Sequence, residues 1–374
     1  YKWVVVVAMA IRFLAIFLLA PVREEGALRV RKALKDLSRI TPSGYRAMRS
    51  LAKSSDAESR VHAIQMVATK NLTLASDEII DALHDPSPRV RRQAASALAR
   101  LEDPKAAQAL IHMLRDHPDL IEEDTIEALG SIANKEAVEP LVQLLQSPKS
   151  MLRRAAAKAL DGLGDSSPIP SLTEAASEPG DPDLRRASVQ ALRMLGARDA
   201  QGVIADALFD PTPSVRIAAA EAIAEMDLTS ALPYVRQSLS YYDDEAASET
   251  AYALGAVGTK DDIPSILAVA DRAVSVITRR RCLLGIARLL KVEREVYRIL
   301  LLEGMSRDSA LMEHLKSTLK ENAVLRRAFA DASAGDDEGG LRKLAQDPRY
   351  TWAKPMVDTP VEELFIVAAC AVAR

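Results

Sequence analysis

The sequence predicts an all-α protein, a superhelix of stacked helix pairs (an α-solenoid) preceded by one transmembrane helix. Its 374 residues are 48% hydrophobic but only 4% aromatic, so the apolar side chains are mainly Ala, Leu, Val and Ile, which suit closely packed helices. A pattern recurs every 31 or 32 residues through most of the chain, and an apolar run lies near its start. With only 15 Gly, the composition argues against a β-sandwich, a barrel or a glycine-looped nucleotide enzyme.

The first element is the apolar run at residues 3–20, WVVVVAMAIRFLAIFLLA. As a helix it is about 27 Å long, close to a hydrocarbon core of about 30 Å. Arg12 in its middle costs about 2.5–3.5 kcal/mol, but the strongly apolar residues contribute about −5 kcal/mol, so insertion is favoured by about 2 kcal/mol. A signal peptide is the alternative, although the run lacks a charged n-region and Pro21 follows the would-be cleavage site.

Basic residues follow the run and set its predicted orientation. Because positive charges stay on the cytoplasmic side, they place the chain after the run in the cytoplasm. They are Arg23, Arg29, Arg31, Lys32, Lys35 and Arg39. We therefore expect a transmembrane helix at residues 1–22 and a basic juxtamembrane helical segment at residues 23–57. Within it, residues 27–37 have an amphipathic pattern that either lies on anionic lipid or begins the helical array.

The beginning of the chain also shows a family resemblance. The Arg inside the apolar run, the aromatic and aliphatic stretch after it and the sequence PVREE at residues 21–25 resemble the last transmembrane helix of major facilitator superfamily transporters. The resemblance implies that the rest of the chain is the cytosolic tail of a transporter whose other helices precede Tyr1.

The repeat occupies residues 58–292. Each copy closes an Ala-x-Leu-like pattern with a branched aliphatic residue, and these residues are Val67, Leu98, Leu129, Leu160, Leu192, Ile223, Leu254 and Ile286. A copy opens with a turn, often Asp-Pro, in which Asp is expected to cap a helix and Pro to take its first position. A short turn and another apolar helix follow, as at residues 106–114. Neither helix can bury its apolar face alone, so we expect stacked copies to form one continuous core.

This pattern resembles the HEAT repeat, most closely the short bacterial form of the phycobilisome-lyase type. The resemblance implies an α-solenoid of about seven or eight helix pairs. Most HEAT arrays place the second helix of each pair on their concave surface. The resemblance says little about chemistry, because function depends on the side chains that such a fold carries.

An arginine recurs at one position of most repeats. The six members of this column are Arg60, Arg91, Arg153, Arg185, Arg216 and Arg279. In HEAT arrays an Arg at this place usually bonds a turn Asp or a carbonyl group of a neighbouring repeat. We therefore expect a structural Arg/Asp ladder, with Asp85, Asp181 and Asp210 as acceptors.

The next position along the helix is rotated by about 100° and is expected to be more exposed on the second helix. Basic residues recur there and nearby, and they form a stripe that fits an acidic protein partner, with ordinary solvated charge as the alternative. The candidate partner-binding residues are Arg92, Arg154, Lys158, Arg186, Arg193 and Arg280. The third repeat differs, because the carboxylates of residues 122–127 either pair with the flanking arginines or interrupt the stripe.

The repeat fades after Ile286. Residues 293–330 keep a helical pattern and are expected to cap the array with a polar outer face. Residues 331–374 are expected to be a linker and a C-terminal segment, which is either complete or truncated. Within it, residues 331–340, DASAGDDEGG, predict a flexible acidic linker. Residues 364–373 are apolar but too short to span a membrane, so they either cap the core or begin something truncated at Arg374.

The sequence predicts no enzyme, no cofactor and no metal site. The five His, at positions 62, 84, 112, 117 and 314, include no His-Glu dipeptide, so the array does not match the HEAT-built di-iron deoxyhypusine hydroxylases. His112 and His117 are expected to be solvated. Cys282 follows three arginines and is either an activated thiolate or a small buried apolar residue. A net charge of −3 and a pI of about 6.1 argue against nucleic-acid binding.

These observations favour a non-catalytic, membrane-tethered scaffold that binds a protein on the cytoplasmic side. One alternative treats the array as the regulatory tail of a transporter. A bilin lyase-like enzyme is the other alternative, and it rests on family resemblance alone.

Overall fold

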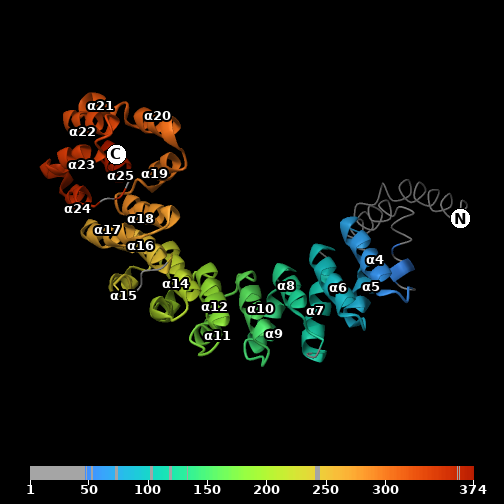
Figure 1. Cartoon of the computed structure of the whole chain (residues 1–374). Helices are drawn as coiled ribbons and strands as arrows, with labels where there is room; N and C mark the ends of the chain where they lie inside the picture. The colour runs from blue at the N-terminus through green and yellow to red at the C-terminus, as the bar shows by residue number, and fades with distance from the viewer. Residues whose placement is uncertain are drawn as a thin grey trace, which may run out of the picture. The chain divides into compact units, whose positions relative to one another are not determined.

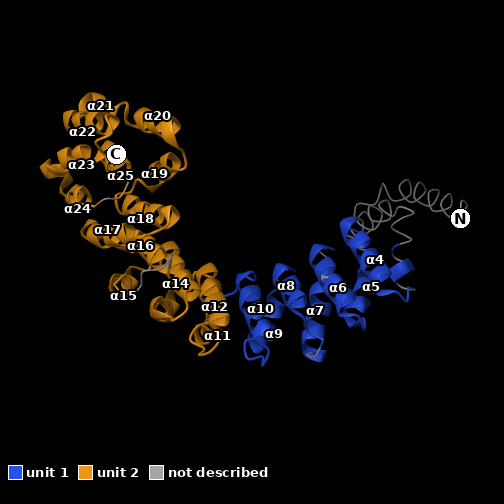
Figure 2. Ribbon diagram, in the orientation of Figure 1, with its two compact units in different colours: residues 1–168 blue, residues 169–374 orange. Residues whose placement is uncertain are grey.

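The computed structural model describes residues 47, 49–51, 54–71, 75–101, 104–117, 120–132, 134–240, 245–359, 361 and 363–374. Within these ranges the regular secondary structure is helical throughout, without a strand (Figure 1). The predicted transmembrane helix lies outside the described residues. None of the described helices combines the length and the apolarity that crossing a bilayer requires. The chain divides into two compact units, residues 1–168 and residues 169–374 (Figure 2).

In the first unit, the helices that follow the period of the arginine column, most of which carry its arginine, alternate with companion helices. We call the former arginine helices; they are α4 (Ala57–Thr69), α6 (Pro88–Leu101), α8 (Glu123–Ile132) and α10 (Ser150–Asp161). The companions are α5 (Ser76–Asp81), α7 (Pro104–Asp116) and α9 (Val138–Leu144), with the short 3-10 helices η2 (Ala82–His84) and η3 (Lys135–Ala137). Each arginine helix packs on the next one along the chain. This stacking of helix pairs is the arrangement of an α-solenoid.

The second unit continues the same alternation. Its arginine helices are α12 (Pro182–Met194), α14 (Pro213–Met226), α16 (Glu245–Val257) and α18 (Val276–Leu289). Their companions are α11 (Ile169–Ala175), α13 (Gln201–Asp206), α15 (Leu232–Ser238), α17 (Ile263–Arg272) and α19 (Glu293–Leu300). The 3-10 helices η4 to η7 flank them at Arg198–Ala200, Ala207–Phe209, Thr229–Ala231 and Lys260–Asp262. The predicted all-α solenoid is therefore found in both units.

The repeat's closing aliphatic residue forms the centre of the core. All eight of these side chains, from Val67 to Ile286, have no exposed surface. Among the buried residues around them alanine is the commonest, and its small side chain lets neighbouring helix axes approach closely. The low aromatic content of the chain follows from this packing, because large rings do not fit between such helices.

The Asp-Pro turns open the helices in two different ways. Asp181 caps α12 as expected, since its carboxylate accepts the N–H of Leu184 at 3.0 Å and Pro182 is the first helical residue. At Asp85 and Asp210 the prediction is wrong, because the helices begin three residues later, at Pro88 and Pro213. There a second Pro disfavours helical backbone at the residue before it and takes the first helical position itself.

Two glycines allow α16 and α18 to touch. A methyl group on Gly285 would lie 2.7 Å from the carbonyl oxygen of Ala251 and 3.1 Å from Cα of Tyr252. A methyl group on Gly255 would overlap the backbone of Gly285. The backbones of the two helices are therefore in direct contact, which only glycine permits.

The remaining helices close the second unit. They are α20 (Gly304–Leu315), α21 (Thr318–Glu321), α22 (Ala323–Ser333), α23 (Asp337–Ala345), η8 (Pro348–Ala353), α24 (Lys354–Val357) and α25 (Leu364–Ala373). The apolar helix α25 is buried almost completely and contacts α18, α19, α20, α22 and α23 (Figure 1). The residues expected to cap the core thus form the centre of this closing bundle.

The predicted acidic linker at residues 331–340 is wrong. These residues end α22 and begin α23, and Asp336 caps α23 by accepting the N–H of Gly339 at 2.8 Å. A methyl group on Gly340 would lie 2.7 Å from the carbonyl oxygen of Ala328 and 2.9 Å from the ring of Phe365. The acidic and glycine-rich composition therefore reflects a helix cap and close packing, not chain flexibility.

The close approach of α16 and α18 predicts opposite effects for one substitution at two sites. Gly285→Ala should destabilise the fold by about 1–3 kcal/mol because the added methyl group overpacks the contact. Gly202→Ala, in α13 where a methyl group meets nothing within 4 Å, should stabilise it by up to about 1 kcal/mol. The midpoints of urea-induced unfolding measure both effects, and equal shifts for the two variants would contradict the packing argument.

Candidate functional site

The first arginine column has one common role. Each of the six guanidinium groups donates a hydrogen bond to a main-chain carbonyl group six or seven residues earlier, in the turn that leads into its own helix. The pairs are Arg60–Ser54 (3.0 Å), Arg91–Asp85 (3.1 Å), Arg153–Ser147 (3.0 Å), Arg185–Glu178 (2.9 Å), Arg216–Asp210 (2.7 Å) and Arg279–Ala273 (3.2 Å). The expectation that these carbonyl groups belong to a neighbouring repeat is therefore wrong. The side chain runs back along its helix toward the N-terminus, so the turn of its own repeat is the closest acceptor.

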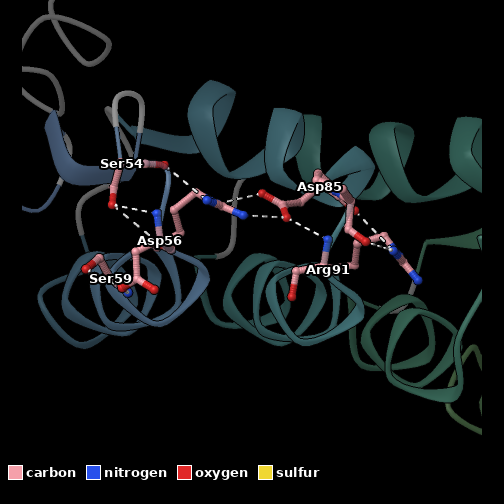
Figure 3. Close-up of polar contacts among 8 residues, drawn as sticks. Ser54, Asp56, Ser59, Asp85 and Arg91 are labelled. Atoms are coloured by element: carbon pink, nitrogen blue, oxygen red, sulfur yellow. Dashed lines mark hydrogen bonds and ion pairs between the residues drawn. The ribbon is translucent and has the colours of Figure 1, made fainter.

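At two repeats an aspartate links successive arginines. Arg60 donates from Nε and Nη2 to the two carboxylate oxygens of Asp85, at 2.7 and 2.9 Å, while the carbonyl group of Asp85 accepts from Arg91 (Figure 3). The same carboxylate accepts the N–H of Ser87 at 2.8 Å, which fixes the turn. These contacts join α4 to the turn that leads into α6.

The second aspartate repeats this arrangement in the other unit. Arg185 donates to both carboxylate oxygens of Asp210, at 2.6 and 3.0 Å, and Thr212 N–H donates to the same carboxylate at 2.8 Å. Burial opposes ionisation of Asp210, but the hydrogen bonds from Arg185 and Thr212 outweigh it and hold the pKa of this carboxyl below its ordinary value. Arg216, only 3% exposed, binds the carbonyl group of Asp210.

The acidic third repeat joins the ladder. Glu122 accepts from Arg91 at 2.6 Å and lies 3.3 Å from Nε of Arg92, and Asp124 lies 4.0 Å from the same Nε. The carboxylates of this repeat therefore pair with the arginines of the repeat before it. Glu122 accepts from Arg91 of the preceding arginine helix, which is the role that Asp85 has for Arg60 one repeat earlier.

The predicted basic stripe is largely neutralised within the chain. In the first unit Arg92 is exposed and faces Glu122, Arg154 is half-buried and Lys158 is exposed. In the second unit three arginines have carboxylate partners of their own. These pairs are Arg186–Asp183 (3.4 Å), Arg193–Glu225 (2.5 Å) and Arg280–Glu363 (2.9 Å). The structure thus brings the stripe residues onto the arginine helices but surrounds most of them with acidic groups.

A second cluster on α14, α16 and α18 was not predicted. Arg281 stacks on the ring of Tyr252, 3.5 Å from its centroid, and donates from Nε and Nη2 to Glu249. The Tyr252 hydroxyl donates to Glu293 at 2.5 Å. Burial raises the pKa of nearby Glu221, and its neighbour Arg193 opposes that rise. The cluster mixes both charges and an aromatic ring, so this face of the second unit is not a basic surface.

Two further residues were missed for different reasons. The carboxylate of Asp262 accepts from Nε and Nη2 of Arg236, at 2.7 and 3.0 Å. It also caps its own turn by accepting the N–H of Thr259. The sequence Thr-x-x-Asp is a signal for such a cap. Glu363 accepts from both Arg280 and Arg307, and no pattern near it in the sequence marks this role, because its partners lie in helices distant along the chain.

The residues singled out for possible chemistry are Cys282, His112 and His117. Cys282 has no exposed surface, and burial raises its pKa to about 12. The hypothesis of an activated thiolate is therefore wrong, and Cys282 packs as a small apolar residue. His112 lies 4.0 Å from Asp116 on its own helix, and the rings of His117 and His84 meet edge to face, with their centroids 4.9 Å apart. Within the part of the chain that the structure describes, no group of three or more potential ligands could hold a metal ion.

Comparison with known proteins identifies the repeat. A family model described as HEAT repeats matches residues 46–129, 123–193 and 202–287, more than half of the chain. No curated protein matches the chain. Among solved structures it is similar to the complex of CpcE and CpcF of phycocyanin lyase from a Nostoc species, at 24% identity over 59% of this chain and 92% of that one, with a TM-score of 0.38. It is also similar to human deoxyhypusine hydroxylase in complex with glycerol, at 20% identity over 66% and 96%, with a TM-score of 0.31. These similarities are too weak to transfer a function.

The buried Arg185–Asp210 pair predicts a large effect from a small change. Asp210→Asn should destabilise the fold by about 3–5 kcal/mol, because it leaves Arg185 buried without its charge partner. Glu58→Gln is the matched control, since Glu58 and its partner Arg89 are both more than 60% exposed and such a pair contributes about 0–1 kcal/mol. Urea-induced unfolding at pH 7 measures both, and similar losses would contradict a structural role for the ladder.

The same pair predicts a pH dependence. Because the folded-state pKa of Asp210 is lowered, its contribution is complete above the unfolded-state pKa of about 3.9 and is lost as the pH falls through the folded-state pKa. The stability difference between the native chain and the Asp210→Asn variant should therefore shrink below about pH 4. A difference that grows on acidification would reverse the assigned sign.

Proposed function

Because the chain belongs to the family of HEAT repeat proteins, we propose that it is a non-catalytic scaffold that binds another protein along the exposed faces of its arginine helices. The observation that supports this proposal is the different surroundings of the two arginine columns. The arginines of the first column donate hydrogen bonds to main-chain carbonyl groups in the turns. The second column and the basic residues near it place charged side chains, among them Arg92 and Lys158, at the surface of their helices.

The pairing of the second column changes the expected partner. A free basic stripe would select an acidic protein by charge alone. Since Arg92, Arg186 and Arg193 lie beside Glu122, Asp183 and Glu225, the surface offers alternating charges at helical spacing. We expect such a surface to select its partner by a matching pattern of both charges, which fixes register more than it raises affinity.

The proposal excludes an enzymatic role, and Cys282 is the residue that supports this part of it. Nucleophilic catalysis by Cys needs an accessible thiolate, and the burial of Cys282 raises its pKa to about 12. A bilin lyase-like activity would require a different acid, base or nucleophile. An assay of pigment transfer to phycobiliprotein subunits is expected to show none.

We place the scaffold at the cytoplasmic face of a membrane, anchored through residues 3–20. Support comes from the sequence alone, namely the apolar run and the basic residues after it. A transporter-tail arrangement differs only in what precedes Tyr1. Sequence upstream of Tyr1 that encodes a set of transporter spans would favour it, and a start codon directly before Tyr1 would exclude it.

Photo-crosslinking tests the binding surface. A photoreactive residue at Lys158, exposed on arginine helix α10, should give a discrete crosslink to another polypeptide in cells. The matched control is Gln108, exposed on companion helix α7, which should give none. Crosslinks of equal yield from both positions, or none from Lys158, would count against binding on the arginine helices.

Membrane anchoring predicts a sharp response to added charge. Insertion of the run is favoured by only about 2 kcal/mol, and each central Arg costs about 2.5–3.5 kcal/mol. Val6→Arg combined with Phe17→Arg in the full chain should therefore move the protein from the carbonate-resistant membrane fraction to the soluble fraction. Val61→Ile, a buried aliphatic exchange in α4, controls for altered expression and should leave fractionation unchanged. An unchanged distribution of the charged variant would contradict a spanning helix at residues 3–20.

A further inference from the structure

Exposed apolar side chains gather in one part of the second unit. Among the described residues, eleven large hydrophobic side chains are exposed, and eight of them lie between Val274 and Met312. Seven form a set that we call the C-terminal apolar patch: Val274, Val276, Ile277, Tyr297, Leu301, Leu302 and Met305. Val274 is 99% exposed, Met305 86% and Ile277 81%. Scattered exposed residues need no explanation, but such a concentration indicates an interaction surface.

The topology brings these residues together. A turn at residues 290–292 joins α18 to α19, and the two helices pack against each other. The start of α18, with Ile277, therefore lies at the same end of this hairpin as the end of α19, with Leu301. The hydrogen bond to Glu363 is the main reason that the pKa of Arg280 on α18 is raised, and Glu303, in the loop after α19, adds to that rise. The patch thus draws on both helices of this hairpin and on the loops that flank them.

Two unpaired cations flank the apolar residues on α19. Arg294, Tyr297, Arg298 and Leu301 follow the i, i+3, i+4, i+7 spacing of a single helix face. The opposite face, with Val296 and Ile299, is buried. Both arginines are exposed. Among the described residues, neither guanidinium has a hydrogen bond or an ion pair. They contrast with the arginines of the second column, most of which have acidic partners.

A cleft beside Ile277 completes the surface. It has a volume of about 210 Å³ and lies between α16 and α18. Leu284 and Ile277 supply its apolar lining, and the paired Arg281 and Glu249 supply one charge of each sign. The cleft has room for one large apolar side chain, which is the usual anchor of a protein interface.

We propose that the C-terminal apolar patch, with Arg294 and Arg298, is the docking site for an acidic amphipathic segment of a partner protein. Apolar side chains of that segment cover Tyr297 and Leu301 and enter the cleft beside Ile277, while its carboxylates pair with the two arginines. This proposal rests on the scaffold function proposed above and gives it a partner class and a surface.

Charge and geometry favour a polypeptide over a lipid surface. Peripheral binding to anionic membranes takes clusters of about four to eight Lys or Arg, whereas α19 also carries Glu293 and Glu295, and Glu303 follows it. These carboxylates repel an anionic bilayer, because its surface is negative everywhere. An acidic segment can instead place its own carboxylates opposite Arg294 and Arg298 alone. Self-association is disfavoured by the same charges, because two copies of the patch would bring these arginines together.

A binding experiment with defined peptides tests the site. The probe is a short fluorescent peptide with Leu at helical spacing and Glu at the other positions, and the reference peptide has Lys in place of each Glu. Fluorescence anisotropy with the full chain should show binding of the acidic peptide and much weaker binding of the basic one. Leu301→Asp should weaken binding of the acidic peptide about tenfold or more. Arg294→Glu with Arg298→Glu should weaken it similarly and improve binding of the basic peptide.

Matched variants elsewhere in the second unit control for surface changes as such. Met194→Asp replaces another exposed apolar residue, 61% exposed, and Arg198→Glu replaces another exposed arginine; neither should alter binding. All variants change exposed side chains, and an unchanged unfolding midpoint verifies that they fold.

Three outcomes would overturn the proposal. One is equal binding of both peptides, or binding unaffected by Leu301→Asp. The second is binding to vesicles of anionic phospholipid, lost in the Arg294→Glu, Arg298→Glu variant, without binding of the acidic peptide. The third is a dimer in sedimentation analysis that Leu301→Asp dissociates. If any of these outcomes occurs while the crosslink from Lys158 persists, the docking site is wrong but the scaffold function stands. If the crosslink is absent while the acidic peptide binds, the docking site stands and binding along the arginine helices is wrong.

Discussion

The structure depends on the close packing of successive arginine helices. The side chains buried between them are small or aliphatic, with alanine the commonest and one fully buried aliphatic residue recurring in every repeat. The eight aliphatic residues have no exposed surface, and at Gly255 and Gly285 the backbones themselves touch. A core of this kind is closely packed along the helices that the structure describes.

Close stacking also requires hydrogen-bond partners for the turns, because each turn between helices carries main-chain carbonyl groups that its helices do not satisfy. The first arginine column supplies them. A guanidinium group is suited to this position because its fixed, planar set of donors can bind a carbonyl group and a carboxylate at once. Arg60 does so with Ser54 and Asp85, and Arg185 does so with Glu178 and Asp210. These arginines hold each turn in place and tie it to the next repeat, so they are not available to a partner.

The sequence was a good guide wherever the period of the repeat determined the structure. It predicted the helical array, the buried aliphatic column and the arginine column, because each recurs and one copy supports the interpretation of the next. It failed where a residue acts only once. Pro88 and Pro213 moved helix starts that the Asp-Pro rule placed earlier. Residues 331–340 were misassigned because Asp336 and Gly340 look the same in a linker as in a helix cap and a tight contact. Glu363 could not be predicted as a partner of Arg280, since the contact joins segments 83 residues apart.

The end of the array explains why an exposed apolar surface arises in the second unit. Within a stack each helix pair covers the apolar face of the one before it, and the last pair has no successor. Here α25 takes this place, burying its own apolar residues against α18 and α19. Glu363 fixes its start through Arg280 and Arg307, in a left-handed conformation (φ 71°) that a non-glycine residue adopts only when its surroundings compensate for it. The closing helices cover the buried side of α19, with Val296 and Ile299, but leave Tyr297 and Leu301 in solvent. Because a polar outer face is what solubility alone requires of a terminal repeat, these exposed apolar residues are the observation on which the proposed docking site rests.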